Sequence, residues 1–417
     1  MMETYTRLWE DKFPAYTYGL PFQQAAAKHV AETLSRKKAL IIVSKTLSKT
    51  TNLTEILQGA LKEHGVETVG IRRGISPHTP YSEVLETVTQ VKEVQADVIV
   101  TLGGGSIIDG AKAISFLEAN PEATKSFDSV TKLFNKAMDR FKHLKSHEPD
   151  DTYNGSTIPI VSITTTLSGG EYNEGGGCTD DRTLVKHLFY PGLKAGPLVI
   201  VFDPMLALTT PLRFWVGTGV RAIDHCVETL LSITEAPEKD QYASRALPLM
   251  IKGLVGSVRE PHNPQHRLQC QLAGVDSMRM FKFEVRLGAS HGIGHQLGPY
   301  GVPHGETSCI MLPSVCKYNA SVNGDKQKEI CEMLWKDDEI ASLLTELGMQ
   351  KSTNDLGDIL KAIFKHLGMP TTLTEAGIDK SKFEDIARNS MVDICTQNNP
   401  VKLTDHKQVL EILQLAQ

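Results

Sequence analysis

The sequence predicts two domains: a Rossmann-like α/β nucleotide-binding domain at residues 1–204 and an all-α domain at residues 205–417. Three observations lead to this prediction. The chain has 417 residues, whereas single hydrophobic cores usually stop growing at about 250–300 residues. Its first half alternates short apolar runs with amphipathic segments. After Asp203 and Pro204, nearly every segment has helical periodicity.

The alternation in the first half is typical of a parallel sheet with helical crossovers. Strands are expected at residues 38–43, 67–71, 96–102, 158–163 and 198–202. Helices are expected at residues 54–64, 81–94 and 106–116. The polar stretch 118–155 is interpreted as a solvated helix and loop without chemistry of its own. The second half is expected to be helices with breaks at prolines.

Composition narrows the class of ligand. A net charge of -5 disfavours a nucleic-acid partner, which normally requires a basic face. The seven cysteines are scattered without a CxxC pair, which favours a reducing compartment. The N-terminus lacks the apolar run of a signal peptide, and no stretch is long enough to span a bilayer. We therefore expect a cytoplasmic protein that acts on small molecules.

Three glycines follow the strand expected at 96–102. They begin the run Gly103-Gly104-Gly105-Ser106, and Asp109 lies in the helix after it. Glycines at a strand-to-helix junction let the backbone approach a phosphate, and the helix N-terminus supplies free N–H groups. Gly104, Gly105, Ser106 and Asp109 are therefore candidate cofactor-binding residues. The alternative is a plain glycine turn that packs a helix on the sheet, with Asp109 favouring the helix dipole.

A hydroxyl-rich loop follows the strand expected at 158–163. Its residues Thr164, Thr165 and Ser168 offer hydrogen bonds to a diphosphate, a ribose or a nicotinamide amide. Alone, this pattern is most often an ordinary loop. Lys186 completes the candidate cofactor-binding residues on this side of the chain.

Histidines dominate the second half. His291 and His295 are four residues apart and share one helix face, and His304 follows a proline turn. Glycines beside all three are interpreted as space for a ligand. The helical segment 214–232 carries Arg221, His225 and Glu228 on one stripe. Viewed alone, this stripe also fits a surface ladder of salt bridges.

Taken in order, these segments resemble the iron-containing alcohol dehydrogenase superfamily, whose dehydroquinate synthase-like fold the resemblance implies for this chain. Metal-dependent members bind Fe²⁺ or Zn²⁺ through one aspartate and three histidines, whose positions match His225, His291 and His304 here. The aspartate's place, four residues before His225, holds Arg221. A guanidinium cannot ligate a cation and repels it. Asp224 is expected to point to another face of the helix.

The chain is more similar to the metal-independent maleylacetate reductase branch, which shares the tight spacing of the threonine loop and lacks the aspartate ligand. Arg221 is not the small polar residue expected in that branch, and the interval from His295 to His304 is one residue shorter. Three histidines can still hold Zn²⁺, so a metal-dependent alcohol or aldehyde dehydrogenase stays an alternative. Two further alternatives are a dehydroquinate-synthase-like lyase and a degenerate nucleotide-binding protein without catalysis.

These residues suggest a mechanism in which NADPH or NADH reduces a small carboxylate-bearing enone or carbonyl compound without a catalytic metal. Arg221 is expected to hold the carboxylate and, with His225 and His291, to stabilise the developing enolate or alkoxide. His295 or His304 supplies the proton. By resemblance, His295 lies closest to the nicotinamide and the protein is a homodimer.

Cofactor choice depends on the residue that ends the first strand. NAD-preferring relatives have an acid there, whereas this chain has Ser44 followed by Lys45. Without the acid, the 2′-phosphate of NADPH is not repelled, so the sequence allows NADPH and favours it over NADH.

Overall fold

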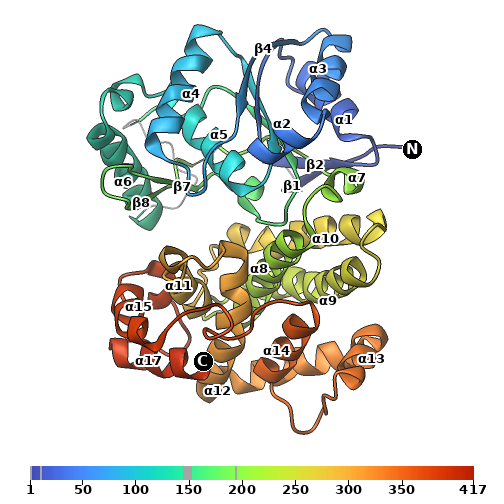
Figure 1. Ribbon diagram of the computed structural model, residues 1–417, viewed down its shortest axis with the longest axis vertical. Coiled ribbons are helices and arrows are strands. Elements are labelled where there is room, and N and C mark those ends of the chain that lie inside the picture. The colour runs from blue at the N-terminus through green and yellow to red at the C-terminus, as the bar shows by residue number, and fades with distance from the viewer. Residues whose placement is uncertain (1, 10–11, 144–152, 193–194) are drawn as a thin grey trace. The chain divides into compact units, whose positions relative to one another are not determined.

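The computed structural model describes residues 2–9, 12–143, 153–192 and 195–417. The chain divides into two compact units, Met1–Thr209 and Thr210–Gln417. The first is an α/β unit and the second is helical, which confirms the predicted fold class (Figure 1). The first unit extends a few residues past 204 because the short helix α7 (Pro204–Ala207) places Leu206 in its apolar core.

A seven-stranded sheet forms the centre of the first unit, with the strand order β1-β2-β9-β6-β5-β3-β4. β1 pairs with β2 antiparallel, and the other neighbouring strands pair in parallel. The strands are β1 (Thr4–Trp9), β2 (Lys12–Tyr18), β3 (Lys38–Val43), β4 (Glu67–Arg73), β5 (Val98–Gly103), β6 (Ile160–Thr164) and β9 (Val199–Val201). The main helices are α1 (Phe22–Lys28), α2 (Lys45–Thr50), α3 (Leu53–Glu63), α4 (Tyr81–Glu93), α5 (Gly105–Glu118) and α6 (Phe127–His143).

Strand β3 shows why the central strands are apolar throughout. Its Leu40 and Ile42 belong to the apolar cluster formed with α4, α5 and α6, whereas Ile41 and Val43 belong to the cluster formed with α1 and α3. A parallel strand covered by helices on both faces must bury both sets of alternating side chains. The expected strands and helices of this region therefore match the structure closely.

The expectation for residues 118–155 was wrong in one respect. The residues that the structure describes include α6, whose Val130, Phe134 and Ala137 are buried in the cluster with α5. The helix is therefore amphipathic, with one face in the core, and is not simply solvated. Residues 144–152 lie outside the described residues.

Sequence analysis missed two antiparallel pairs. The first is β1 with β2 at the sheet edge, and the second is β7 (Gly176–Thr179) with β8 (Lys186–Phe189). Polar residues interrupt the strands of the first pair, and β7 begins with two glycines, so neither pair has the apolar run that marks the buried strands.

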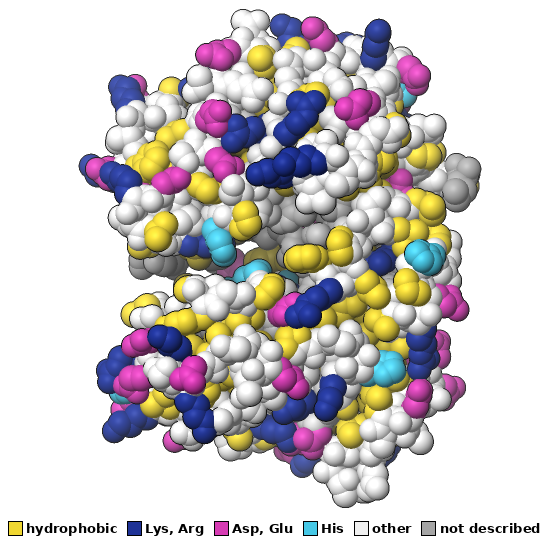
Figure 2. All heavy atoms as spheres, in the orientation of Figure 1, with side chains coloured by type: hydrophobic (Ala, Val, Ile, Leu, Met, Phe, Trp, Pro, Cys, Tyr) yellow, Lys and Arg dark blue, Asp and Glu magenta, His cyan; other side chains and the backbone are white. Residues whose placement is uncertain are grey.

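In the second unit, every regular element that the structure describes is a helix. α8 (Leu212–Leu231) packs against α9 (Pro237–Arg259) and α12 (His304–Lys336). The other helices are α10 (Pro264–Ser277), α11 (Ala289–His295), α13 (Asp338–Glu346), α14 (Leu356–His366), α15 (Phe383–Ser390), α16 (Ile394–Gln397) and α17 (His406–Leu415). No described helix is both long and apolar enough to cross a membrane. On the face in Figure 2, acidic and basic side chains are interspersed over each unit.

Candidate active site

Three loops of the first unit follow neighbouring parallel strands. Ser44 follows β3, Gly104 and Gly105 follow β5, and the loop from Thr165 to Ser168 follows β6. Because β3, β5 and β6 are adjacent and parallel, these loops meet at one edge of the sheet. This is the edge at which open α/β sheets bind ligands.

The glycines permit close approach of two of these loops. A Cβ at Gly104 would lie 3.0 Å from the Thr166 side chain, and one at Gly105 would lie 3.1 Å from Ser168 Oγ. Gly104 precedes the first turn of α5 and supplies no side-chain cap, so the N–H groups of Gly105 and Ser106 are oriented as in phosphate-binding helix termini. This cradle fits a dinucleotide.

Other predicted cofactor residues have partners within the protein. Asp109 forms an ion pair of 2.9 Å with Lys112, a fully buried lysine that also donates to the Gly170 carbonyl at 2.8 Å. Thr164 donates to the backbone oxygen of Thr166 at 3.0 Å. Asp109 and Thr164 therefore order the loops, and sequence analysis missed Lys112.

Ser44 lies against the glycine turn. A Cβ at Gly103 would be 3.1 Å from Ser44 Cβ, and the Ser44 hydroxyl caps α2 by accepting from Leu47 N at 3.3 Å. Lys45 begins α2 and is exposed. Lys186 lies on the exposed side of β8, outside the three loops.

The stripe on α8 is buried, which excludes the surface-ladder alternative. Arg221, His225 and Glu228 are 6%, 5% and 8% exposed. The N-terminal part of α8 approaches α12 closely at two glycines, where a Cβ on Gly305 would lie 2.8 Å from the carbonyl carbon of Gly217. This close packing brings the stripe toward the start of α12.

Arg221 is buried without an ion-pair partner. Among the described residues, no carboxylate oxygen lies within 4.0 Å of its guanidinium nitrogens. Its hydrogen bonds are long, 3.5 Å to Ser308 Oγ and 3.5 Å to His295 Nε2. Burial lowers the pKa of Arg221 from its ordinary value. A buried cation is costly unless it is paired, so this side chain is suited to an anionic ligand.

Two carboxylates support His291 from behind. Its Nδ1 lies 2.8 Å from Glu228 Oε2 and 3.3 Å from Asp224 Oδ2. Glu228 also accepts from the backbone N–H groups of Gly288 and Ser290, at 2.9 and 3.0 Å. Asp224 leaves α8 on another face than His225, as expected, but its carboxylate still reaches the cluster, so the expected separation from the site was wrong.

Asp224 is fully buried and accepts from the hydroxyls of Ser290 and Ser308, at 2.9 and 2.6 Å. Burial raises the pKa of Asp224 to about 6 and raises that of Glu228 well above its usual range, with the charge of Asp224 adding to the effect on Glu228. These two acids face the Nδ1 side of His291, so they orient the ring.

His225 and His291 are neutral imidazoles near pH 7. Burial, with the charge of Arg221, lowers the pKa of His225 to about 3 and that of His291 well below its usual range. The rings stack with centroids 5.0 Å apart. His225 Nδ1 and His291 Nε2 are buried without a hydrogen-bond partner. The pairing of His291 Nδ1 with Glu228 favours the tautomer that carries the ring proton on Nδ1, which leaves Nε2 as an acceptor.

His295 pairs with a residue that sequence analysis missed. Its Nδ1 lies 2.9 Å from Asp393 Oδ2, and its ring is parallel to that of His304 with centroids 5.9 Å apart. Burial alone would raise the pKa of Asp393, but the hydrogen bond and the charge of His295 lower it. The His295 side chain is 33% exposed, so it can exchange protons with solvent.

The glycines beside the histidines serve close packing of helices and do not leave open space. A Cβ at Gly292 would lie 2.6 Å from Thr396 N, and one at Gly294 would lie 3.0 Å from Thr307 Oγ1. These contacts fix α11 against α16 and α12. The sequence interpretation of ligand space was therefore wrong at these positions.

Comparisons with known proteins decide the family. The sequence model of iron-containing alcohol dehydrogenase matches residues 20–204, and that of the Fe-containing alcohol dehydrogenase family C-terminal domain matches residues 215–417. The chain belongs to the iron-containing alcohol dehydrogenase family. It is therefore an NAD(P)-dependent oxidoreductase, as the resemblance predicted.

Two relatives align over nearly their whole length. Dehydrogenase FUM7 of Gibberella moniliformis is 38% identical over 97% of this chain and 96% of its own. Dehydrogenase ALT3 of Alternaria alternata is 36% identical over 91% of this chain and 98% of its own.

Two solved structures share the fold of the family. The alcohol dehydrogenase from Oenococcus oeni has a TM-score of 0.79 at 24% identity, covering 96% of this chain and 98% of that one. Maleylacetate reductase from Agrobacterium tumefaciens has a TM-score of 0.71 at 20% identity, covering 96% and 95%. At these identities the likeness concerns the fold.

The side chains at the position of the family's metal site do not fit an iron ion. Arg221 occupies the position of the acidic ligand, and its guanidinium lies 3.5 Å from His295. The ligand atoms of His225, His291 and His304 do not come together within 4.8 Å of one another. Among the described residues, two other groups of potential metal ligands do lie within 4.8 Å of one another. One is Asp224, Glu228 and His291, and the other is His295, Asp393 and Cys395.

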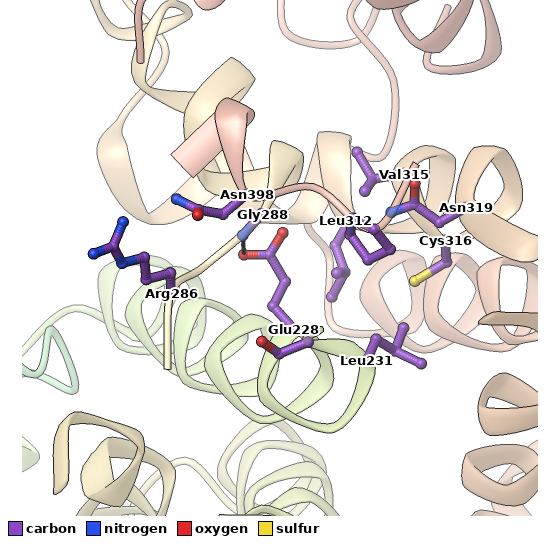
Figure 3. A pocket seen from close by; sticks show the side chains of 11 residues that line it. Glu228, Leu231, Arg286, Gly288, Leu312, Val315, Cys316, Asn319 and Asn398 are labelled. Carbon is purple, nitrogen blue, oxygen red and sulfur yellow. Dashed lines mark hydrogen bonds between the residues drawn. The ribbon is translucent and has the colours of Figure 1, made fainter. Parts of the chain in front are cut away.

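A small cavity lies behind the cluster (Figure 3). Its volume is about 20 Å³, enough for about one water molecule. Figure 3 shows the Glu228 carboxylate directed toward Gly288, with Asn398 and Arg286 beyond it. At about 20 Å³, this cavity is too small to be the substrate site.

Proposed function

We propose that this dehydrogenase reduces a carboxylate-bearing carbonyl or unsaturated compound with NADPH or NADH, and that it does so without a catalytic metal. One observation carries the proposal: Arg221 is a buried guanidinium, and no carboxylate of the described part of the chain lies within 4.0 Å of it. Guanidinium matches a carboxylate in bidentate geometry, so a substrate carboxylate would complete the missing ion pair.

The chemistry needs a hydride, an anion stabiliser and a proton donor. A bound reduced nicotinamide supplies the hydride to the electron-poor carbon. Arg221 and His225 then supply positive charge and an N–H to the oxygen that becomes an alkoxide or enolate. Neutral His291, whose free nitrogen is an acceptor, orients the neighbouring groups and is not itself a donor.

His295 delivers the proton in this proposal. Asp393 holds its Nδ1, so the Nε2 atom faces the Arg221 side of the site. The carboxylate of Asp393 also balances the charge of an imidazolium next to a guanidinium. His304, stacked on His295, is the second proton donor to consider.

The test is a spectrophotometric screen of NADPH and NADH oxidation across unsaturated and keto di- and tricarboxylates, beginning with maleylacetate. Each substrate is compared with its methyl ester, with and without a chelator. The proposal predicts turnover of free acids that chelation leaves unchanged. Equal turnover of esters and acids would contradict the role of Arg221.

A second candidate is a metal-dependent alcohol or aldehyde dehydrogenase. It is favoured by His225 Nδ1 and His291 Nε2, two buried nitrogens without partners that could face an ion. The variant Arg221→Asp separates the candidates because it restores the acidic ligand. We expect it to gain a Zn²⁺ site that His225→Gln abolishes and that the wild-type protein lacks. Equal Zn²⁺ binding by both proteins, lost in His225→Gln, would favour the second candidate.

A further inference from the structure

Three side chains of different chemistry meet beside the histidine cluster. They are His295 at the end of α11, Asp393 immediately before α16, and Cys395 in its first turn. One ligand atom from each lies within 4.8 Å of the other two. His295 Nδ1 and Asp393 Oδ2 are 2.9 Å apart.

This spacing suits a tetrahedral Zn²⁺ site. Ligand atoms in such a site are roughly 3.5 Å apart, given metal–ligand distances of about 2.0–2.3 Å. Small side-chain rotations would therefore suffice. Asp393 Oδ1 is held by Cys395 N at 2.9 Å, which leaves Oδ2 directed toward His295. The close contact of Gly292 with Thr396 keeps α11 and α16 in place.

The three donors are accessible, in contrast to the other set of metal-ligating atoms. His295, Asp393 and Cys395 are each partly exposed, whereas Asp224, Glu228 and His291 are buried. Among the seven cysteines, only Cys395 and Cys331 are not buried. A cation from solvent can therefore reach this set without opening the core.

The charges also match. Burial, with the charge of Asp393, raises the pKa of the Cys395 thiol, so the second negative charge beside Asp393 arises only when a cation displaces the thiol proton. Arg221 contacts the opposite ring nitrogen of His295, Nε2, so the ring separates the guanidinium from the donors. A divalent soft-to-borderline cation that accepts nitrogen, sulfur and oxygen ligands is the expected occupant.

We propose that His295, Asp393 and Cys395 form a Zn²⁺ site whose occupation inhibits the enzyme. On binding, the Cys395 thiol loses its proton to solvent, and His295 binds the ion through Nδ1 with its ring proton carried on Nε2. Asp393 Oδ2 then contacts the ion in place of the ring. The inhibitory part of this inference rests on the proposed role of His295 as proton donor. The binding part does not depend on that role.

The test measures Zn²⁺ binding and turnover on the same metal-stripped protein. Binding is read by competition with a chromophoric chelator and by protection of Cys395 from alkylation, detected by peptide mass spectrometry. The variant Cys395→Ser removes the sulfur ligand, and Cys331→Ser is the matched control. We expect one Zn²⁺ per wild-type chain and loss of turnover. Cys395→Ser should keep basal turnover but bind Zn²⁺ roughly 100-fold more weakly.

Each contrary result has a distinct meaning. Unchanged Zn²⁺ affinity in Cys395→Ser, or the absence of binding to the wild-type chain, would overturn the site. Binding that survives in Cys395→Ser but is lost in His225→Gln would place the ion at the three histidines and overturn it as well. Binding that protects Cys395 without inhibition would keep the site, overturn its regulatory role and count against His295 as proton donor.

Discussion

Replacement of Arg221 by glutamine should separate binding from stability. Glutamine keeps a polar group of similar reach but removes the charge that the proposed substrate carboxylate pairs with. Losing one partner of a buried, hydrogen-bonded charge pair costs about 2–5 kcal/mol, which corresponds to a roughly 30-fold to several-thousand-fold lower kcat/KM. The loss should appear for the free acid and largely vanish for its methyl ester.

The same variant should be more stable than the wild-type protein in the absence of ligand. Arg221 is 6% exposed and has no carboxylate within 4.0 Å among the described residues, so only the more distant charges of acids such as Asp224 and Glu228 offset the burial of its charge. Removing that charge should raise the free energy of unfolding by on the order of 1–3 kcal/mol. Lower activity together with higher stability is the expected signature of a residue kept for its ligand.

Steady-state kinetics on acid and ester substrates, with urea unfolding of the ligand-free protein, measures both effects. Arg213→Gln is the matched control, since Arg213 is on the same helix but exposed and paired with Glu306 at 2.7 Å. The reasoning is refuted if Arg221→Gln keeps kcat/KM for the acid within a factor of about 3, or about 0.65 kcal/mol.

Three further predictions concern other parts of the chain. Asp393→Asn keeps the cap of α16 but removes the charge beside His295, so kcat should fall roughly 10- to 100-fold. A kcat within a factor of about 2 of the wild-type value counts against the pairing. Ser44→Asp still caps α2 but repels a 2′-phosphate, so kcat/KM for NADPH should fall about tenfold or more relative to kcat/KM for NADH. An unchanged ratio of the two values would contradict the placement of Ser44 beside the 2′-phosphate. Burial raises the pKa of Glu171 from 4.5 to about 7, so its contribution to stability falls as pH rises through that range. Glu171→Gln should therefore raise the free energy of unfolding by on the order of 1–3 kcal/mol at pH 8 and little at pH 4. An equal effect at both pH values would contradict the raised pKa.

Most of the fold was predictable because the parallel strands are buried on both faces. Such strands have continuous apolar runs, as in residues 38–43, whose predicted bounds match β3 to the residue. The other predicted strands begin and end within two residues of the structure. The edge hairpin of β1 and β2 was not predictable in this way, since β1 is mostly exposed and has no apolar pattern. α6 was misjudged because its polar composition masked a narrow apolar stripe.

The site was predictable where its residues share a helix. Arg221, His225 and Glu228 recur at helical spacing, so the sequence placed them together. Asp393 lies nearly a hundred residues from His295, and only the contact of α11 with α16 joins them. An aspartate before a helix reads as a simple N-cap, so no local signal indicated its second partner.

Asp224 shows a different limit of helical spacing. One residue from His225, it was assigned to another face, yet α11 and α12 surround α8 closely enough for Ser290 and Ser308 to bind its carboxylate. When a helix is buried on nearly all sides, as α8 is, different faces meet the same polar cluster.

We propose that the fixed guanidinium of Arg221 stabilises the developing negative charge, as a metal ion does in metal-dependent relatives. The most direct measurement is turnover of a carboxylate substrate by exhaustively chelated protein, with iron and zinc quantified in the same sample. If catalysis is independent of metal, we expect undiminished turnover at a metal content far below one ion per chain. Turnover that disappears on chelation and returns in proportion to added Fe²⁺ or Zn²⁺ would contradict it.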